Sequence, residues 1–424
     1  MPLRILDHTV NRRAERHVII CVDGVGISTI SKMRAEGHFK IFHAPSRMIS
    51  TFPSLTNAAL SKILEPAGAS MTGGYEDNFF DTQANRMRGG ILDRFRSGRF
   101  VRGTFRELFD YHPSAIKSGL GYAAPPLSTY LESLSDLARL RQKARNSRQP
   151  VFFAYTGVTD SLAHLGGETL LRSFLKQLDD TIEDIISHSK TPVTVTIFSD
   201  HGNDFRKYRR VGLKEPLRQA GFKLGNKIKD DQSVVLPQFG LIGSAVLFTR
   251  DQNEERVAGI LATVEGVDFV AYEKDGMVHI ISRGGKGTIE KRADQYRYLA
   301  TEGDPIGLSS ITKRNGNNGF IKDEDWFVET QAGVRPDVVQ RVFEGVTRGV
   351  LNRANVIVNL EDGYYTGNSL LDALTVLQAT HGNIGQEQSY GFVMTTTSEL
   401  PPYIRAANLW ETLGSAQLLR SPRR

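Results

Sequence analysis

Three stretches of the chain are continuously apolar or β-branched, without the alternation of polar and apolar residues that marks a half-buried strand. They cover residues 17–22, 150–158 and 192–198. Such runs are typical of strands that are buried on both faces of a parallel sheet. Amphipathic segments with helical spacing follow the first two runs, at residues 26–37 and 168–188, and we interpret them as helices that cover the sheet. The pattern predicts an α/β core with a mostly parallel sheet.

The middle of the chain differs from both ends. Residues 206–349 are more basic and richer in glycine, and within them residues 267–282, VDFVAYEKDGMVHIIS, contain two alternating apolar runs around a Lys-Asp-Gly turn. That pattern predicts a β-hairpin. We interpret residues 206–349 as an inserted α+β cap. Residues 1–205 and 350–424 would then form the core, with a strand and loop of the core at residues 355–367.

Composition narrows the range of functions. Of the 424 residues, 40% are hydrophobic and 24% are charged, which is typical of a globular protein with an ample core. The formal net charge of +6 suits a small anionic substrate, and we predict no nucleic-acid partner. The N-terminal residues lack the apolar stretch of a secretory signal. The sequence also contains no run of about 18 apolar residues, so we predict no contact with a membrane. A single cysteine, Cys21, excludes an internal disulfide, and we predict a cytoplasmic location.

Acidic residues and histidines follow all three apolar runs. Asp23 follows the first run, and the pair Asp200-His201 follows the third. After the second run, Asp160 and His164 are four residues apart, so both would lie on one face of a helix. Ligands of open α/β sheets bind beyond the carboxyl ends of the strands, and we therefore expect these side chains to meet. These aspartates and histidines also have alternative roles in which they bind no ligand. An aspartate before a glycine can simply form a turn, and a histidine can simply lie in contact with solvent.

Residues 47–60, RMISTFPSLTNAAL, combine a proline-containing turn with the start of an apolar helix. Thr56 is predicted to be the N-cap of that helix. Unpaired N–H groups and the positive end of the helix dipole stabilise phosphate oxygens at such a position. It therefore suits a hydroxyl that attacks a phosphate ester. The alternative is a threonine that only caps the helix.

A further histidine, His381, lies in the glycine-flanked turn THGNIG near the C-terminal end. With it, the chain offers three aspartates, three histidines and one hydroxyl, enough to hold two divalent cations with nitrogen and oxygen ligands. Zinc suits such ligands first, and manganese or iron also accepts them. The predicted ligand set is Asp23, Thr56, Asp160, His164, Asp200, His201 and His381.

Taken together, these motifs resemble those of the alkaline phosphatase superfamily, especially its branch of type I phosphodiesterases, nucleotide pyrophosphatases and phosphonoacetate hydrolases. The motifs are VDG at the first run, FPSLTN around Thr56, DSLAH after the second run, SDHG after the third, and THG near the end. Their order and spacing carry the resemblance, which covers residues 17–204 and 355–397. It implies an alkaline-phosphatase-like three-layer α/β/α core, mostly parallel, with the α+β cap inserted.

The resemblance also implies a role for each motif residue. Two divalent cations would be bound by Asp160, His164 and His381 on one side and by Asp23, Asp200 and His201 with Thr56 on the other. A threonine hydroxyl is a poor nucleophile at neutral pH, and coordination by a cation lowers its pKa. Thr56 would then attack the substrate and form a phosphothreonine intermediate, which water hydrolyses.

One position departs from the pattern of the family. Nucleotide pyrophosphatases carry an asparagine that binds a phosphate oxygen in the loop after the nucleophile helix, and in this chain Asp77 stands at that position. An acid would repel a phosphate, so either the neighbouring Asn78 takes the role or the loop bends differently. We predict Asn57 and Asn78 as substrate-binding residues. The aromatic residue that follows the nucleophile in those enzymes is absent after Thr56, so nucleotide selectivity is not predicted.

We therefore predict a two-metal-dependent hydrolase of small phosphate esters, whether a phosphodiester, a nucleotide pyrophosphate or a phosphomonoester. Two alternatives remain: a phosphonate hydrolase of the same superfamily, and a non-catalytic protein of this fold that binds an anion. The complete ligand set favours an enzyme, because a non-catalytic relative would tolerate the loss of at least one ligand. The sequence does not indicate the substrate, the native metal or the oligomeric state.

Overall fold

Strand β1 (Arg16–Val22) shows how the sequence builds the first sheet. Val18 and Ile20 pack into one apolar cluster, and Ile19 and Cys21 pack into another on the opposite face of the sheet. Successive side chains of a strand point to opposite faces. An uninterrupted apolar run therefore needs cover on both sides, and this strand has it.

The computed structural model describes residues 16–89, 105–113, 126–238, 240–314, 319–374 and 376–414. In these residues the first sheet has six strands in the order β20-β2-β19-β6-β1-β5. Besides β1, they are β2 (Ser46–Ile49), β5 (Val151–Thr156), β6 (Val193–Phe198), β19 (Tyr390–Thr395) and β20 (Tyr403–Arg405). Only β19 is antiparallel to its neighbours, whereas β1 pairs in parallel with both β5 and β6. The mostly parallel sheet that the sequence predicts is confirmed.

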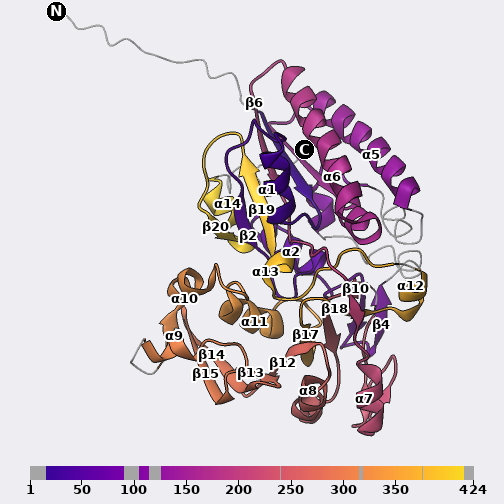
Figure 1. The fold of residues 1–424 in the computed structure, drawn as a ribbon, viewed down its shortest axis with the longest axis vertical. Coiled ribbons are helices and arrows are strands. Elements are labelled where there is room, and N and C mark those ends of the chain that lie inside the picture. Colours follow the sequence, from indigo (N-terminus) through magenta and orange to yellow (C-terminus); the bar gives the residue numbers. More distant parts are fainter. Residues whose placement is uncertain are drawn as a thin grey trace, which may run out of the picture.

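Helices cover both faces of this sheet (Figure 1). One apolar cluster joins the sheet to α1 (Ile27–Ala35), α5 (Pro126–Asn146) and α6 (Val158–Ser187). Another joins the opposite face to α2 (Thr56–Ile63), η1 (Glu65–Ala67), η2 (Phe105–Leu108), η4 (Ala406–Asn408) and α14 (Leu409–Thr412). The first lobe is therefore a three-layer α/β/α core, as predicted.

A second lobe is built on an antiparallel sheet. Its order is β11 (Ser244–Leu247), β17 (Val356–Leu360), β12 (Val267–Lys274), β13 (Met277–Ser282), β14 (Gly285–Arg292), β15 (Gln295–Gly303) and β16 (Ile321–Lys322). One face packs against α9 (Ser309–Arg314), α10 (Asp323–Thr330) and α11 (Val338–Thr347), and the other against α7 (Lys214–Gln219) and α8 (Glu254–Ala262). Strands β12 and β13 form the predicted hairpin, with Asp275 and Gly276 at positive φ in its turn.

The return of the chain to the core differs from the prediction. Strand β17 follows residue 349, yet it pairs with β11 and β12 of the second lobe. Its side chains alternate between the two apolar clusters of that lobe, with Ile357 on the α11 side and Val358 on the α8 side. A β-branched run is equally suited to either sheet, and the pattern therefore could not assign it. The described chain reaches the first sheet again only at β19.

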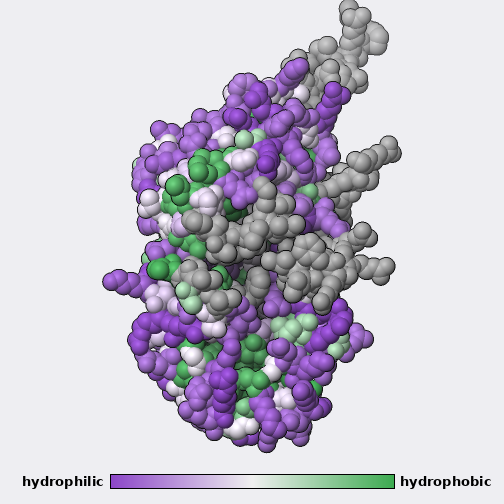
Figure 2. All heavy atoms as spheres, turned by 90° about the vertical axis from the view of Figure 1, so that its right-hand side faces the viewer, coloured by the Kyte–Doolittle hydropathy of each residue, from purple (hydrophilic) through white to green (hydrophobic). Residues whose placement is uncertain are grey.

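Smaller elements complete the described part of the chain. They are β3 (Asn78–Asp81), β4 (Arg86–Gly89), β7 (Arg209–Arg210), β8 (Lys223–Leu224), β9 (Ser233–Val234), β10 (Leu241–Ile242), β18 (Tyr364–Gly367), η3 (Asp251–Asn253), α12 (Ser369–Leu374) and α13 (Gln386–Ser389). Among the described residues, no helix has the length and apolar character to cross a membrane. On the face drawn in Figure 2, hydrophilic side chains predominate among the described residues, and hydrophobic side chains are visible on both lobes.

The cover of the first sheet by α14 can be tested at Trp410. Its ring is fully buried edge-on against Phe153 and Phe198, and its Nε1 donates a hydrogen bond to the carbonyl oxygen of Ile63 at 2.6 Å. We expect Trp410→Ala to lower the free energy of unfolding by about 3–5 kcal/mol, measured by denaturant titration. Val334→Ala, at a side chain that is 76% exposed, is the control and should change it little. Equal effects of the two variants would contradict this packing.

Candidate metal centre

The carboxyl ends of β5, β1 and β6 lie at one edge of the first sheet, because the three strands are parallel neighbours. Asp23 follows directly after β1, and Asp200 follows two residues after the end of β6. Beyond β5 the chain enters α6, whose first turn carries Asp160. The three aspartates that the sequence predicts are therefore gathered at this edge, and all are buried.

One group of ligand atoms comes from Asp23, Asp200 and His201, all within 4.8 Å of one another. The Nε2 atom of His201 lies 3.5 Å from Asp23 Oδ1 and 3.5 Å from Asp200 Oδ2. The hydroxyl of Thr56 reaches the same group, with Oγ1 at 3.1 Å from Asp23 Oδ1 and 3.1 Å from His201 Nε2. Thr56 is partly exposed, whereas the other three are buried, so its hydroxyl is the member of this group that is open to a substrate.

The second group consists of Asp160, His164 and His381, also within 4.8 Å of one another. His164 lies one turn after Asp160 on α6, and its Nε2 is 3.3 Å from Asp160 Oδ1. His381 Nε2 is 3.7 Å from the same oxygen. The two groups adjoin, because the rings of His201 and His381 stack with centroids 4.0 Å apart. All seven predicted ligands therefore meet in one place.

Main-chain carbonyls fix the protonation of two histidines. Nδ1 of His201 lies 2.9 Å from the carbonyl oxygen of Gly202, and Nδ1 of His381 lies 2.9 Å from that of Ser54. A carbonyl oxygen only accepts hydrogen bonds, so Nδ1 carries the proton in both rings. The lone pair of each Nε2 then points toward the carboxylates, which is the arrangement of metal-binding histidines.

Burial and mutual repulsion make two of the three carboxylates, those of Asp23 and Asp200, costly to ionise. Burial, with repulsion from Asp200 and Asp160, raises the pKa of Asp23 well above its usual range. Burial and the charge of Asp160 raise the pKa of Asp200 to about 7. At Asp160 itself burial opposes ionisation, but attraction by the histidines His164 and His381 outweighs it and holds the pKa well below the usual range. Cations at the two groups would remove the repulsion.

The donor set fits divalent cations. Oδ2 of Asp200 is buried and has no hydrogen-bond partner among the described residues, although buried polar atoms are normally satisfied. It lies on the side of Asp200 that faces His201 Nε2. Each group offers carboxylate oxygens and imidazole nitrogens, the ligand types that zinc, manganese and iron accept.

Thr56 is the first residue of α2, and the N-cap position belongs to Leu55, which has extended backbone angles. The sequence placed the helix start one residue too late. The expected environment is otherwise present, since Thr56 lies at the N-terminal end of an eight-residue helix. The N–H groups of its first turn have no partner within the helix.

Two neighbours of the ligands, Asn203 and Tyr155, were not predicted from the sequence. Asn203 Nδ2 donates to the carbonyl oxygen of Gly24 at 2.7 Å and to Asp160 Oδ1 at 3.1 Å. The hydroxyl of Tyr155, on β5, donates to Asp23 Oδ2. Only Asn203 had a sequence signal, because it directly follows the Asp-His-Gly motif. The side chain of Tyr155 looked like any aromatic residue of a buried strand.

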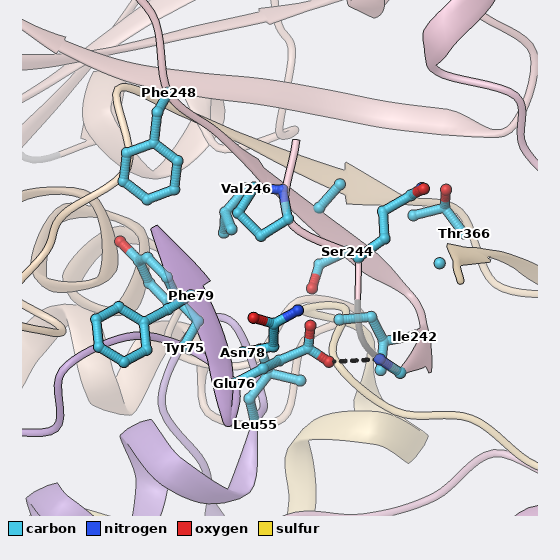
Figure 3. Close-up of a pocket in the computed structure, with 15 residues that line it drawn as sticks. Leu55, Tyr75, Glu76, Asn78, Phe79, Ile242, Ser244, Val246, Phe248 and Thr366 are labelled. Carbon is cyan, nitrogen blue, oxygen red and sulfur yellow. Dashed lines mark hydrogen bonds between the residues drawn. The ribbon is translucent and has the colours of Figure 1, made fainter. Parts of the chain in front are cut away.

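The predicted substrate-binding residues have different surroundings. Asn57 Nδ2 donates to Asp77 Oδ1 at 3.2 Å, and both terminal nitrogens of Arg106 lie 3.5 Å from the same oxygen. Asn78 lines a cavity of about 20 Å³ between the lobes, room for one water molecule. Figure 3 shows the Asn78 side chain in that cavity beside Glu76, which accepts a hydrogen bond from the backbone N–H of Gly240.

Comparison with known proteins supports the fold. No protein-family model matches the chain, and neither does any curated protein sequence. Among solved structures, human ectonucleotide pyrophosphatase/phosphodiesterase 5 matches 97% of this chain and 96% of its own, with 11% identity and a TM-score of 0.53. Phosphonoacetate hydrolase from Sinorhizobium meliloti, in complex with phosphonoformate, matches 95% of this chain and 96% of its own, with 13% identity and a TM-score of 0.54.

A murine form of the first protein, an inactive threonine-to-alanine variant in complex with AMP, matches 97% of both chains with 11% identity and a TM-score of 0.50. The human protein and the phosphonoacetate hydrolase both belong to the alkaline phosphatase superfamily. At these identities the likeness concerns the fold, and the chain has the alkaline-phosphatase-like fold that the sequence predicts.

The assembly of the two groups can be tested at Gly24. This residue has a φ of +63°, and a Cβ atom there would lie 2.6 Å from Asp160 Oδ1 and 2.7 Å from Asn203 Nδ2. We expect zinc to raise the melting temperature of the native protein and EDTA to reverse that rise. Gly24→Ala should weaken zinc binding about 10-fold or more, measured by calorimetric titration. Gly212→Ala, where a Cβ meets open space, is the control. Native zinc affinity in Gly24→Ala would contradict the assembly.

Proposed function

We propose that the protein is a two-metal-dependent hydrolase of small anionic phosphate esters and that Thr56 is its nucleophile. The carrying observation is the position of the Thr56 hydroxyl, 3.1 Å from both Asp23 Oδ1 and His201 Nε2 and beside a second group of ligands. An ordinary helix-capping threonine has no need of six buried metal-ligand side chains around it. The substrate would be a phosphodiester, a nucleotide pyrophosphate or a phosphomonoester.

The similar structures support this class of reaction. The human protein is named for nucleotide pyrophosphatase and phosphodiesterase activity, and the bacterial one is a phosphonoacetate hydrolase bound to a phosphonate. The murine variant that lacks a threonine is inactive and still binds AMP. Each acts on or binds a group with a tetrahedral phosphorus centre, which is the centre we propose for the substrate here.

We assign the two cation sites to the two ligand groups described above, with Thr56 joined to the group of Asp23. Zinc is the first candidate, followed by manganese and iron. When bound, the cations supply Lewis acidity, which lowers the pKa of a coordinated hydroxyl and offsets negative charge on the transferred group. The N–H groups at the start of α2 add a positive electrostatic potential at the same place.

The chain's own residues then carry the reaction. Oγ1 of Thr56 loses its proton and forms a bond to phosphorus, while the bond from phosphorus to the leaving oxygen breaks and that oxygen takes up a proton. Water next attacks the phosphothreonine, the bond from phosphorus to Thr56 Oγ1 breaks, and a proton of that water restores the Thr56 hydroxyl. The product that leaves is phosphate, or a phosphomonoester when the substrate is a diester. Asp23 is held by Tyr155 and His201 by the carbonyl oxygen of Gly202, and these two bonds keep the partners of the hydroxyl in place.

Charge compensation would make the approach to Thr56 suitable for phosphate. The carboxylate of Asp77 lies beside Asn57, the residue after Thr56, and alone it would repel an anion. Arg106 offsets its charge, and attraction by Asp77 in turn outweighs burial and raises the pKa of Arg106. We therefore propose Asn57, with Arg106, as the polar contacts of the substrate phosphate. The proposal for Asn78 is weaker, because its side chain lines the separate small cavity.

Thr56→Ala tests the nucleophile. We expect turnover of p-nitrophenyl phosphate esters to fall by a factor on the order of 10³ or more. Zinc content, measured by mass spectrometry of the purified protein, should remain because six ligands are unchanged. Thr56→Ser is the matched control, since it keeps a hydroxyl, and it should retain measurable turnover. Full activity of Thr56→Ala would remove Thr56 from the mechanism.

A substrate panel separates the alternative functions. Phosphomonoesters, phosphodiesters, nucleotide pyrophosphates and phosphonoacetate should be assayed with the zinc-loaded native protein. Turnover of phosphonoacetate alone would assign the phosphonate hydrolase. Binding of these anions without turnover, while both cations are present, would assign the non-catalytic protein and overturn the proposed hydrolase.

The role of Arg106 is tested by a double-mutant cycle with Asp77. Arg106→Met removes the ion pair between Arg106 and Asp77, and we expect KM to rise about 10-fold, equivalent to roughly 1.4 kcal/mol. Asp77→Asn in the same protein should restore the part of the affinity that was lost to repulsion by Asp77. If the double variant is no better than Arg106→Met alone, charge compensation is not what Arg106 contributes.

A further inference from the structure

A buried arginine of the second lobe reaches the loop that precedes Thr56. Arg341, on α11, donates from Nη2 to the carbonyl oxygen of Thr51 at 2.9 Å and to the hydroxyl of Ser54 at 3.0 Å. Its Nη1 donates to the carbonyl oxygen of Pro336 at 2.8 Å. The side chain is only 3% exposed, so these contacts have no competition from bulk solvent. One arginine therefore connects the inserted lobe to the segment that carries the proposed nucleophile.

Ser54 also contacts His381, a member of the second ligand group. Its carbonyl oxygen accepts the hydrogen bond from His381 Nδ1 at 2.9 Å, and its backbone N–H donates to the carbonyl oxygen of Gly382 at 3.3 Å. Its hydroxyl donates to the carbonyl oxygen of Asn383 at 2.9 Å. Since Arg341 can only donate, the hydroxyl accepts from it and donates its own proton to a carbonyl oxygen, that of Asn383 or, at 3.2 Å, that of Thr51. Every polar atom of Ser54 is thus used to hold two loops and one helix together.

The surface of α11 is shaped for this loop at a second point. Gly345 lies one turn after Arg341, and a Cβ atom there would be 2.1 Å from the carbonyl oxygen of Phe52. Only glycine allows so close an approach of the helix to the loop. The carbonyl oxygen of Gly345 also accepts a hydrogen bond from Tyr75 at 3.1 Å. Two positions on one face of α11 therefore fit the segment 51–54 independently.

The charge of Arg341 is balanced on its own helix. Asp337, the N-cap of α11, is buried and attracts it, while burial lowers the pKa of Arg341 to about 10. The guanidinium is therefore positively charged at neutral pH. A second arginine, Arg405 of the first lobe, binds both Asp337 and Asp323. Arg405 also joins the lobes, but none of its hydrogen bonds goes to the segment 51–54.

We infer that Arg341 is a positioning residue of the active site, which holds Ser54 and through it the nucleophile Thr56 and the imidazole of His381. This inference deepens the proposed function and rests on it. The inserted lobe would then be part of the catalytic machinery as well as a cover for the site. Loss of Arg341 frees the segment 51–54, so the orientation of His381 Nε2 and the position of the Thr56 hydroxyl are no longer fixed.

The test compares Arg341→Met, Arg341→Lys and Arg405→Met. In Arg341→Met we expect one of two zinc ions to bind about 10- to 100-fold more weakly, measured by competition with a chromophoric chelator. With both sites saturated, kcat should fall while KM changes little, because the substrate contacts at Asn57 and Arg106 remain. Arg341→Lys should recover part of the zinc affinity and part of kcat. The lysine ammonium can donate to Thr51 or Ser54, but it cannot reproduce the planar guanidinium group that donates to both.

Arg405→Met is the matched control, because it removes a partly buried contact between the same lobes. It should lower the melting temperature without changing zinc affinity or kcat. Native zinc affinity and native kcat in folded Arg341→Met would overturn the inference, as would equal losses in Arg405→Met.

Ser54→Ala provides a milder variant if Arg341→Met does not fold. It removes only the hydroxyl that joins Arg341 to Asn383, and a smaller loss of zinc affinity in the same direction is expected, whereas native affinity would count against the inference. Zinc affinity is measured without substrate. Failure of the hydrolase proposal would therefore appear as absent turnover in the native protein, and failure of the positioning role as unchanged zinc affinity in the variants.

Discussion

Repulsion among buried carboxylates is the constraint on which the arrangement of this site depends. Three parallel strands end side by side, and the chain places an aspartate beyond each end. Without compensation such a group would destabilise the fold, since burial and like charge together raise the pKa of Asp23 and of Asp200. Imidazoles from α6, from the end of β6 and from the turn at His381 surround the carboxylates, and two cations would complete the neutralisation. The negative charge that makes the site costly to build is also the property that would favour divalent cations there.

Much of this centre could be predicted because its ligands lie close together in the sequence or at equivalent places in the topology. The spacing of Asp160 and His164 follows from helix geometry, and the Asp200-His201 pair follows from its place at the end of an apolar run. His381 is separated from them by the whole inserted lobe, and only the count of ligands indicated it. The start of α2 was one residue off, because helix ends depend on backbone geometry that residue types determine only loosely.

The parts that could not be predicted depend on contacts between distant segments. The apolar pattern of β17 fits either sheet, so the sequence could not show that this strand lies outside the core. Its pairing with β11 and β12 places it in the second lobe. The proximity of Arg106 to Asp77 likewise arises from a loop and a short helix that meet only in the folded chain. Local patterns indicate what an element is, whereas its neighbours are set by packing between whole elements.

The position of the second lobe within the chain has a consequence for biosynthesis. The segment with His381 and the strand β19 leave the ribosome after the whole insertion, although they complete a sheet whose other central strands were made much earlier. A nascent chain that has emerged as far as His201 therefore carries all three aspartates of the site without the last imidazole. Contacts of such long sequence separation form slowly. The ability to hold a full complement of cations is thus acquired only when the end of the polypeptide has been made and docked.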